Sequence, residues 1–91
     1  MARVVVTIKI MPEGVETDLE AIKLYAGKQI AEFGGEVGKE EIEPIAFGLM
    51  CLKLTFIMDE DLGSTEDLEK QIEELDGVNS VDCIDVRRTI G

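Results

Sequence analysis

Two stretches of the chain alternate between apolar and more polar positions, which is the period of a half-buried strand. In residues 3–11 the apolar side of the alternation is formed by Val4, Val6, Ile8 and Ile10. In residues 51–58 the corresponding side is formed by Leu52, Leu54, Phe56 and Met58. The pattern therefore predicts two strands that each bury one face, and the second of them should be central in a sheet.

Two other stretches repeat their apolar residues at three- and four-residue steps, as an amphipathic helix does. The first follows 17–20, whose spacing is that of a capping box with the Thr17 hydroxyl as the cap, and it should run to about Phe33, before the glycine pair 34–35. Its stripe is Leu19, Ile22, Ala26, Ile30 and Phe33. The second helix should begin within 64–67 and end at Gly77, with the stripe Leu68, Ile72 and Leu75.

Two further strands are indicated with less regular patterns. Residues 36–46 are polar and contain Pro44, which cannot donate to a ladder, so this strand belongs at a sheet edge. Residues 78–88 form the last strand, but strict alternation puts Val81 and Cys83 on one face and Ile84 and Val86 on the other. Either both faces of this strand are partly covered, or a bulge shifts its register.

The order of these elements is βαββαβ, and the two halves echo each other in sequence around their first strands and helices. Right-handed crossovers bring two such halves together as a split βαβ of the α+β class, known as ferredoxin-like. We expect a four-stranded antiparallel sheet with the first and third strands in the centre and both helices on one face. Residues 1–91 should form a single domain, because no linker or low-complexity tract interrupts them.

The formal net charge of −11 disfavours direct nucleic-acid binding, which normally relies on a basic patch. It should mainly keep the domain soluble, and it would also attract a basic protein partner. No apolar run approaches the roughly 20 residues that span a bilayer, so no membrane association is expected. The first residues lack the pattern of a secretory signal, which makes the cytoplasm the expected location.

The chain has little equipment for covalent chemistry. It contains no histidine, and Cys51 and Cys83 should be reduced, buried thiols rather than a disulfide or a metal site. The carboxylates of 59–61 lack the spacing of a calcium loop and should form a solvated acidic turn. We therefore expect no catalytic residues, no metal and no cofactor, and a protein that is not an enzyme.

Two features remain as candidates for binding a partner. Phe47 stands before Gly48 at a bend, where it would either anchor a partner or pack under its own hairpin. Arg87 and Arg88 lie near the chain end, where they would either reach into an anionic pocket or keep an exposed strand end hydrated. The residues alone leave both choices open.

The run 44–49, Pro-Ile-Ala-Phe-Gly-Leu, resembles the catalytic domain of the translation elongation factor 1-beta family. The likeness continues through Leu52-Lys53-Leu54, the acidic turn, and the last strand 78–82 that leads to a basic end. It covers essentially the whole chain, and the compact length without appended domains is similar to the archaeal form.

The resemblance implies a guanine-nucleotide exchange factor for elongation factor 1-alpha, the GTPase that delivers aminoacyl-tRNA to the ribosome. The family's exposed phenylalanine, which sits in a pocket of the GTPase, matches Phe47 beside Gly48. The family's basic residue near the C-terminus, which reaches towards the magnesium and phosphates, falls on Arg88. Because that residue is a lysine in the eukaryotic pattern, Arg87 is retained as the alternative.

Two other classes of function remain compatible with the fold, which hosts many unrelated activities. A regulatory domain of this topology would bind a small molecule at a dimer interface. A structural subunit of a larger complex would bind a partner without changing nucleotide release.

Overall fold

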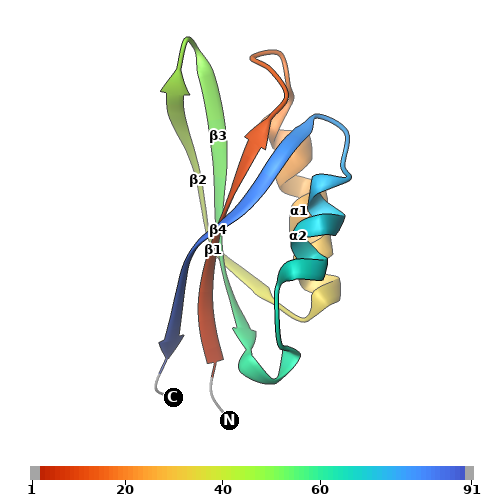
Figure 1. The fold of residues 1–91 in the computed structure, drawn as a ribbon, viewed down its shortest axis with the longest axis vertical. Coiled ribbons are helices and arrows are strands. Elements are labelled where there is room, and N and C mark those ends of the chain that lie inside the picture. The colour runs from red at the N-terminus through yellow and green to blue at the C-terminus, as the bar shows by residue number, and fades with distance from the viewer. Residues whose placement is uncertain (1–2, 90–91) are drawn as a thin grey trace.

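The computed structural model describes residues 3–89. Four strands and two α-helices follow one another in the predicted order βαββαβ, and a short 3₁₀ helix, η1, precedes the second α-helix (Figure 1). The elements are β1 (Arg3–Pro12), α1 (Leu19–Phe33), β2 (Glu36–Ala46), β3 (Leu49–Asp59), η1 (Glu60–Leu62), α2 (Glu66–Glu73) and β4 (Val78–Thr89).

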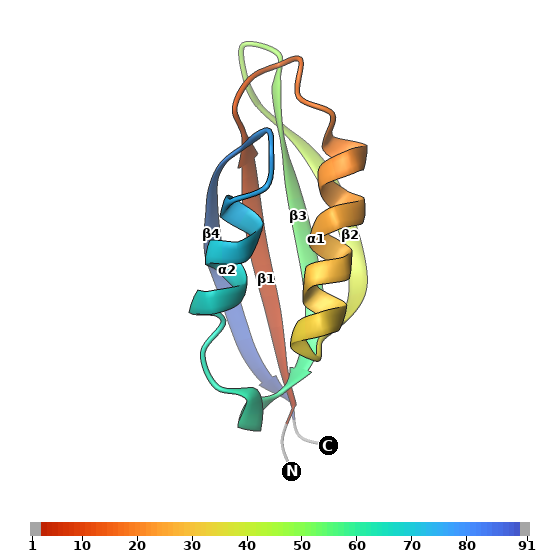
Figure 2. The ribbon, with the colours of Figure 1, turned by 90° about the vertical axis from the view of Figure 1, so that its right-hand side faces the viewer.

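The strands form one antiparallel sheet in the order β2-β3-β1-β4. The two strands with the clearest alternation, β1 and β3, are therefore the central pair, and the polar, proline-containing β2 lies at an edge, as predicted. Figure 2 shows α1 and α2 side by side on the same face of the sheet. The α+β ferredoxin-like prediction is thus confirmed, and the molecule is a narrow rod of 42 × 21 × 17 Å.

The core lies between the sheet and the two helices. The alternating apolar residues of β1 and β3 meet the stripes of the helices there, and the buried residues include Val6, Ile8, Ile10, Ile22, Ala26, Ile30, Leu52, Leu54, Phe56, Leu68 and Ile72. Each apolar stripe is buried because only one side of its strand or helix faces the other layer. This is why the periods of two and 3.6 residues in the sequence predicted the strands and helices. Phe56 is fully buried, so no aromatic side chain of β3 faces outward to stack on a base.

The capping of α1 differs from the prediction by one residue. Asp18 is the N-cap, and its carboxylate accepts hydrogen bonds from the backbone N–H groups of Glu20 and Ala21 at 3.1 and 3.3 Å. The Thr17 hydroxyl instead accepts from the N–H of Gly14 at 3.2 Å, which tightens the preceding loop. Asp and Thr are both good caps, so the spacing alone did not distinguish the two adjacent residues.

The irregular pattern of β4 has its cause in a bulge. Thr7 of β1 pairs with Asp85 and Ile8 pairs with Cys83, so Ile84 is an extra residue without a partner. After the bulge Val86 lies opposite Val6, on the helix side of the sheet. Of the two interpretations that the sequence left open, the bulge is the one found.

One of the two cysteines does not lie where it was expected. Cys51 is buried and free, as predicted, but Cys83 is free and exposed. Partial burial, with a smaller contribution from nearby Glu69, raises the pKa of the Cys83 thiol. The prediction of two buried thiols was wrong for Cys83 because β4 is an edge strand with a neighbouring strand on one side only, whereas Cys51 lies on the central strand β3.

The connection from α1 to β2 brings the backbone unusually close to the core. A Cβ atom on Gly35 would lie 2.9 Å from the Cγ2 atom of Ile30 and 3.0 Å from the Cδ2 atom of Phe56, both of which are fully buried. Gly35 is therefore required by close packing at this corner, since interiors tolerate added volume poorly.

We predict that Gly35→Ala lowers the free energy of unfolding by about 1–3 kcal/mol, because the added methyl group must displace the buried side chains of Ile30 and Phe56. The matched control is Gly27→Ala on α1, where a Cβ atom would meet nothing within 4 Å. That change should raise the free energy of unfolding by about 0.5–1 kcal/mol through helix propensity. Urea denaturation of the two variants checks both signs, and equal stabilities would contradict the packing argument.

Candidate partner-docking site

The tip of the β2–β3 hairpin presents an aromatic side chain directly to solvent. Phe47 and Gly48 are the two turn residues between the paired Ala46 and Leu49, and both have positive φ, 52° and 79°. Positive φ at both central residues is the geometry of a type I′ turn, which matches the twist of the strands. Phe47 is fully exposed to solvent, so its side chain does not pack under its own hairpin.

The backbone of Phe47 is also strained. Among residues 3–89 it is the one non-glycine residue with positive φ. For a residue with a bulky side chain this conformation costs about 1–2 kcal/mol, and asparagine or glycine would occupy it more cheaply. Both the exposure of the apolar Phe47 ring to water and the positive φ of its backbone are therefore unfavourable. Strained residues of this kind are found at functional sites.

The two arginines are adjacent in sequence but lie on opposite faces of the sheet. Arg88 is opposite Val4 of β1, on the face that carries the helices, whereas Arg87 is opposite Val5, on the open face. The Arg87 guanidinium contacts the Asp85 carboxylate at 3.0 Å and its side chain is 78% exposed. Only Arg88 lies on the side of η1 and α2.

Arg88 has a specific partner at this end of the rod. One of its terminal guanidinium nitrogens donates to the Glu60 carboxylate at 2.7 Å, and this hydrogen bond, reinforced by the charge of Glu60, raises the pKa of Arg88. The 59–61 segment is thus more than the solvated turn that was predicted, because Glu60 is the first residue of η1 and binds β4. The Arg88 side chain is 68% exposed and remains accessible to a partner.

Glu60 is a residue of this region that the sequence interpretation missed. The signal was present as three consecutive acids at the end of β3 and two consecutive arginines at the end of β4. The end of β3 and the end of β4 lie on either side of the start of β1, since Met58 and Arg88 are both paired with Val4. The topology alone therefore brings the acidic residues after β3 close to the arginines of β4, and an ion pair between them could have been predicted.

The structure does not bring Phe47 and the arginines together. The hairpin tip lies at one end of the long axis, and β4 ends at the other, beside the start of β1 (Figure 1). From Leu49, next to the tip, to Met58, level with Arg88, β3 runs without interruption, which at about 3.3 Å per residue corresponds to about 30 Å. The candidate site therefore consists of two contact points at opposite ends of a rod.

Between residues 3 and 89 no group of three or more His, Cys, Asp or Glu side chains is arranged to hold a metal ion. Over the same residues, neither α-helix has the length and apolar character needed to cross a bilayer.

The chain matches the EF-1 guanine nucleotide exchange domain family over residues 5–89. Elongation factor 1-beta of Methanothermobacter thermautotrophicus is 42% identical over 88 residues, which cover 97% of this chain and 98% of that protein. Elongation factor 1-beta of Methanobrevibacter smithii is 46% identical over 88 residues with the same coverage, and that of Methanococcoides burtonii is 40% identical over 90 residues, covering 99% of this chain and all of that protein.

Among solved structures, the C-terminal domain of the MgtC protein from Mycobacterium tuberculosis superposes with a TM-score of 0.62, covering 92% of this chain and 86% of that domain. The sequence identity is 15%, so this likeness concerns the fold alone.

The strain at the hairpin tip predicts that Phe47→Asn raises the free energy of unfolding by up to about 1 kcal/mol. Asparagine adopts positive φ more readily than phenylalanine, and the exposed phenyl ring contributes no packing that would be lost. Thermal unfolding of the variant beside the wild-type protein is the measurement. A clear loss of stability would mean that the ring packs against the domain.

Proposed function

Because the chain belongs to the EF-1 guanine nucleotide exchange domain family, we propose that it promotes exchange of GDP for GTP on elongation factor 1-alpha during translation, acting in the cytoplasm as a single domain. It would do so without covalent chemistry of its own. The observation that carries the proposal is Phe47, an apolar side chain held fully exposed and strained at the tip of the hairpin.

In this proposal the hairpin tip is the anchor. A buried aromatic side chain is typical of the residues that supply most of the binding energy at an interface. Phe47, with Gly48 completing the turn, would enter a pocket of the GTPase as a preformed hairpin, so little conformational entropy is lost on binding. The acidic surface of the chain would favour encounter with basic regions of the partner.

The other end of the rod would act on the nucleotide site. Magnesium in a GTPase bridges the phosphates to the protein, so a cation placed beside it disfavours the metal and loosens the nucleotide. Arg88 is the better placed of the two arginines, because it lies on the helix side and is held by Glu60 in the free protein. On docking, the Arg88 guanidinium would exchange the Glu60 carboxylate for the anions of the nucleotide site.

The rigid separation of about 30 Å makes the two contacts interdependent. Docking of Phe47 fixes one end, and β3 then fixes how far Arg88 extends into the partner. Because linkage is reciprocal, a factor that weakens nucleotide binding must itself bind the nucleotide-free GTPase more tightly than the loaded one.

We predict that Phe47→Asn and Phe47→Ala weaken binding to elongation factor 1-alpha by at least about 2 kcal/mol, which is on the order of thirtyfold in Kd. Because the ring is exposed in the free protein, the loss should occur in fully folded protein. Titration calorimetry with the GTPase measures Kd, and circular dichroism checks the fold. Unchanged affinity in a folded variant would remove Phe47 from the interface.

The second prediction separates docking from exchange. Replacing Arg87 and Arg88 together by Ala should leave the melting temperature nearly unchanged, since both side chains are exposed, and should slow GDP release from the GTPase. Arg88→Ala alone should account for most of the effect. Release of fluorescent GDP at saturating magnesium is the measurement, and lowering magnesium should partly mask the defect because the metal has already left.

The matched control for this experiment is Lys39→Ala with Lys70→Ala, which removes two exposed cations from β2 and α2 and so changes the net charge equally. The control should release GDP at the wild-type rate. Release at that rate by the double arginine variant as well would exclude both arginines from exchange. Binding of the wild-type protein without any faster release would instead identify a structural subunit.

A further inference from the structure

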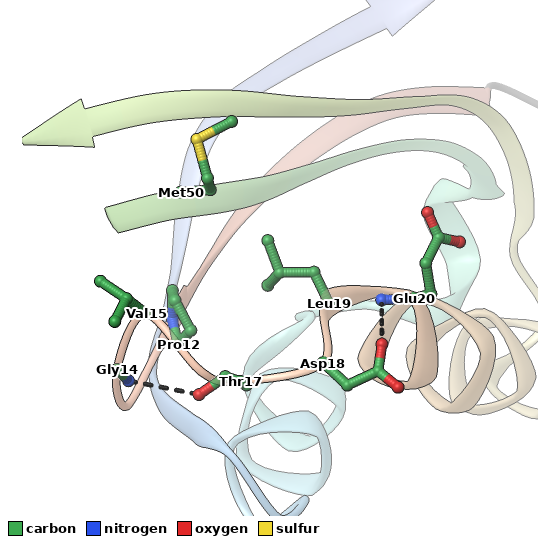
Figure 3. Close-up of a pocket in the computed structure, with 8 residues that line it drawn as sticks. All are labelled: Pro12, Gly14, Val15, Thr17, Asp18, Leu19, Glu20 and Met50. Carbon is green, nitrogen blue, oxygen red and sulfur yellow. Dashed lines mark hydrogen bonds between the residues drawn. The ribbon is translucent and has the colours of Figure 1, made fainter. Parts of the chain in front are cut away.

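An apolar pocket of about 190 Å³ is lined in part by the loop that follows β1. Figure 1 shows this loop at the same end of the molecule as the tip of the β2–β3 hairpin. The pocket is formed where the loop after β1, the first turn of α1 and the beginning of β3 meet (Figure 3). Leu19 rises from the start of α1 towards β3, which carries Met50, and Pro12 and Val15 lie on the loop side. The lining residues are Pro12, Gly14, Val15, Thr17, Asp18, Leu19, Glu20 and Met50.

The size of this pocket limits what it binds. Sites for cofactors and drug-sized molecules usually enclose about 300–1,000 Å³, well above the volume here. The pocket is large enough for one side chain of another protein. Val15 is 65% exposed, so an incoming side chain would cover apolar surface that the free domain leaves in water.

The mouth of the pocket is acidic. The segment 13–22 carries four carboxylates and no lysine or arginine, and two of the four, Asp18 and Glu20, line the pocket itself. Asp18 is engaged in capping α1, and the Glu20 carboxylate pairs with Lys23 at 2.8 Å. An apolar floor beside carboxylates suits a lysine or arginine, whose methylene groups lie on apolar surface while the charge stays at the rim.

The occupant is more readily a different protein than a second copy of this chain. Two copies that each carry a net charge of −11 repel one another, whereas a cationic side chain is drawn to the carboxylates. Met50 is three residues beyond Phe47 along the same hairpin, or about 10 Å. A partner surface that extends about 10 Å from Phe47 along the hairpin would reach Met50 and the pocket.

We propose that the pocket between Val15, Leu19 and Met50 receives a lysine or arginine side chain of the GTPase to which Phe47 docks, an inference that rests on the proposed function. Phe47 inserts into the partner, and the partner inserts into the pocket. A single anchor leaves the rod free to rotate about the hairpin tip. The second contact fixes its direction, and with it the position of Arg88 at the far end.

The experiment compares Val15→Ser, Glu20→Gln and their combination with matched changes on α1 outside the pocket. Leu24→Ser removes a side chain that is 61% exposed, and Glu32→Gln removes one exposed carboxylate, yet neither residue lines the pocket. Binding to the GTPase is measured over a series of salt concentrations. The combined pocket variant should raise Kd about tenfold, and the combined control should leave it nearly unchanged. Glu20→Gln should also flatten the dependence of Kd on salt more than Glu32→Gln does.

The outcomes separate this inference from the function on which it rests. If Phe47→Asn weakens binding but the pocket variants match their controls, the pocket proposal is overturned and the proposed function stands. If Val15→Ser weakens binding while Glu20→Gln equals Glu32→Gln, the occupant is apolar and the cationic side chain is excluded. If the wild-type protein sediments as a dimer and Val15→Ser sediments as a monomer, the pocket binds a second copy of the chain. A wild-type protein that does not bind the GTPase overturns both proposals.

Discussion

The pairing of β1 with β3 is the interaction on which the rest of this small domain depends. These central strands bury their alternating apolar residues against both helices, and their ladder runs from Arg3 opposite Asp59 to Ile10 opposite Leu52. Both edge strands are attached to this pair, β2 to β3 and β4 to β1. A twisted ladder of this kind resists bending far more than a loop does, so the hairpin tip and the end of β4 are held at a fixed separation.

Much of the fold could be predicted from the sequence because burial in the core requires apolar residues at regular intervals along each strand and helix. A side chain such as Leu54 or Ile8 is buried only if its neighbours on both sides point away, which leaves a period of two in the sequence. The helix stripes carry the same information at a period of 3.6, and Pro44 excludes its strand from the centre of the sheet. These signals depend only on the local sequence and not on residues that are distant along the chain.

The features that could not be predicted depend on distances between elements. The exposure of Cys83 follows from the position of β4 at the edge of the sheet, and the ion pair of Glu60 with Arg88 follows from where β3 and β4 end. The bend at Phe47 was visible in the sequence, but its complete exposure depends on the two-residue turn that places it at the tip of the β2–β3 hairpin. Local sequence carries turn preferences, whereas side-chain accessibility is a property of the assembled layers.

The bulge at Ile84 determines which arginine lies on which side of the molecule. Strict alternation counted from Val81 would have turned Arg87 towards the helices and Arg88 towards the open face. The single extra residue reverses this parity, and Arg88 then lies level with Glu60. The orientation of the cations is therefore set by whether the number of unpaired, bulged residues between Cys83 and the arginines is odd or even. Two chains with the same Arg-Arg pair and different bulges would present opposite cations to the same partner.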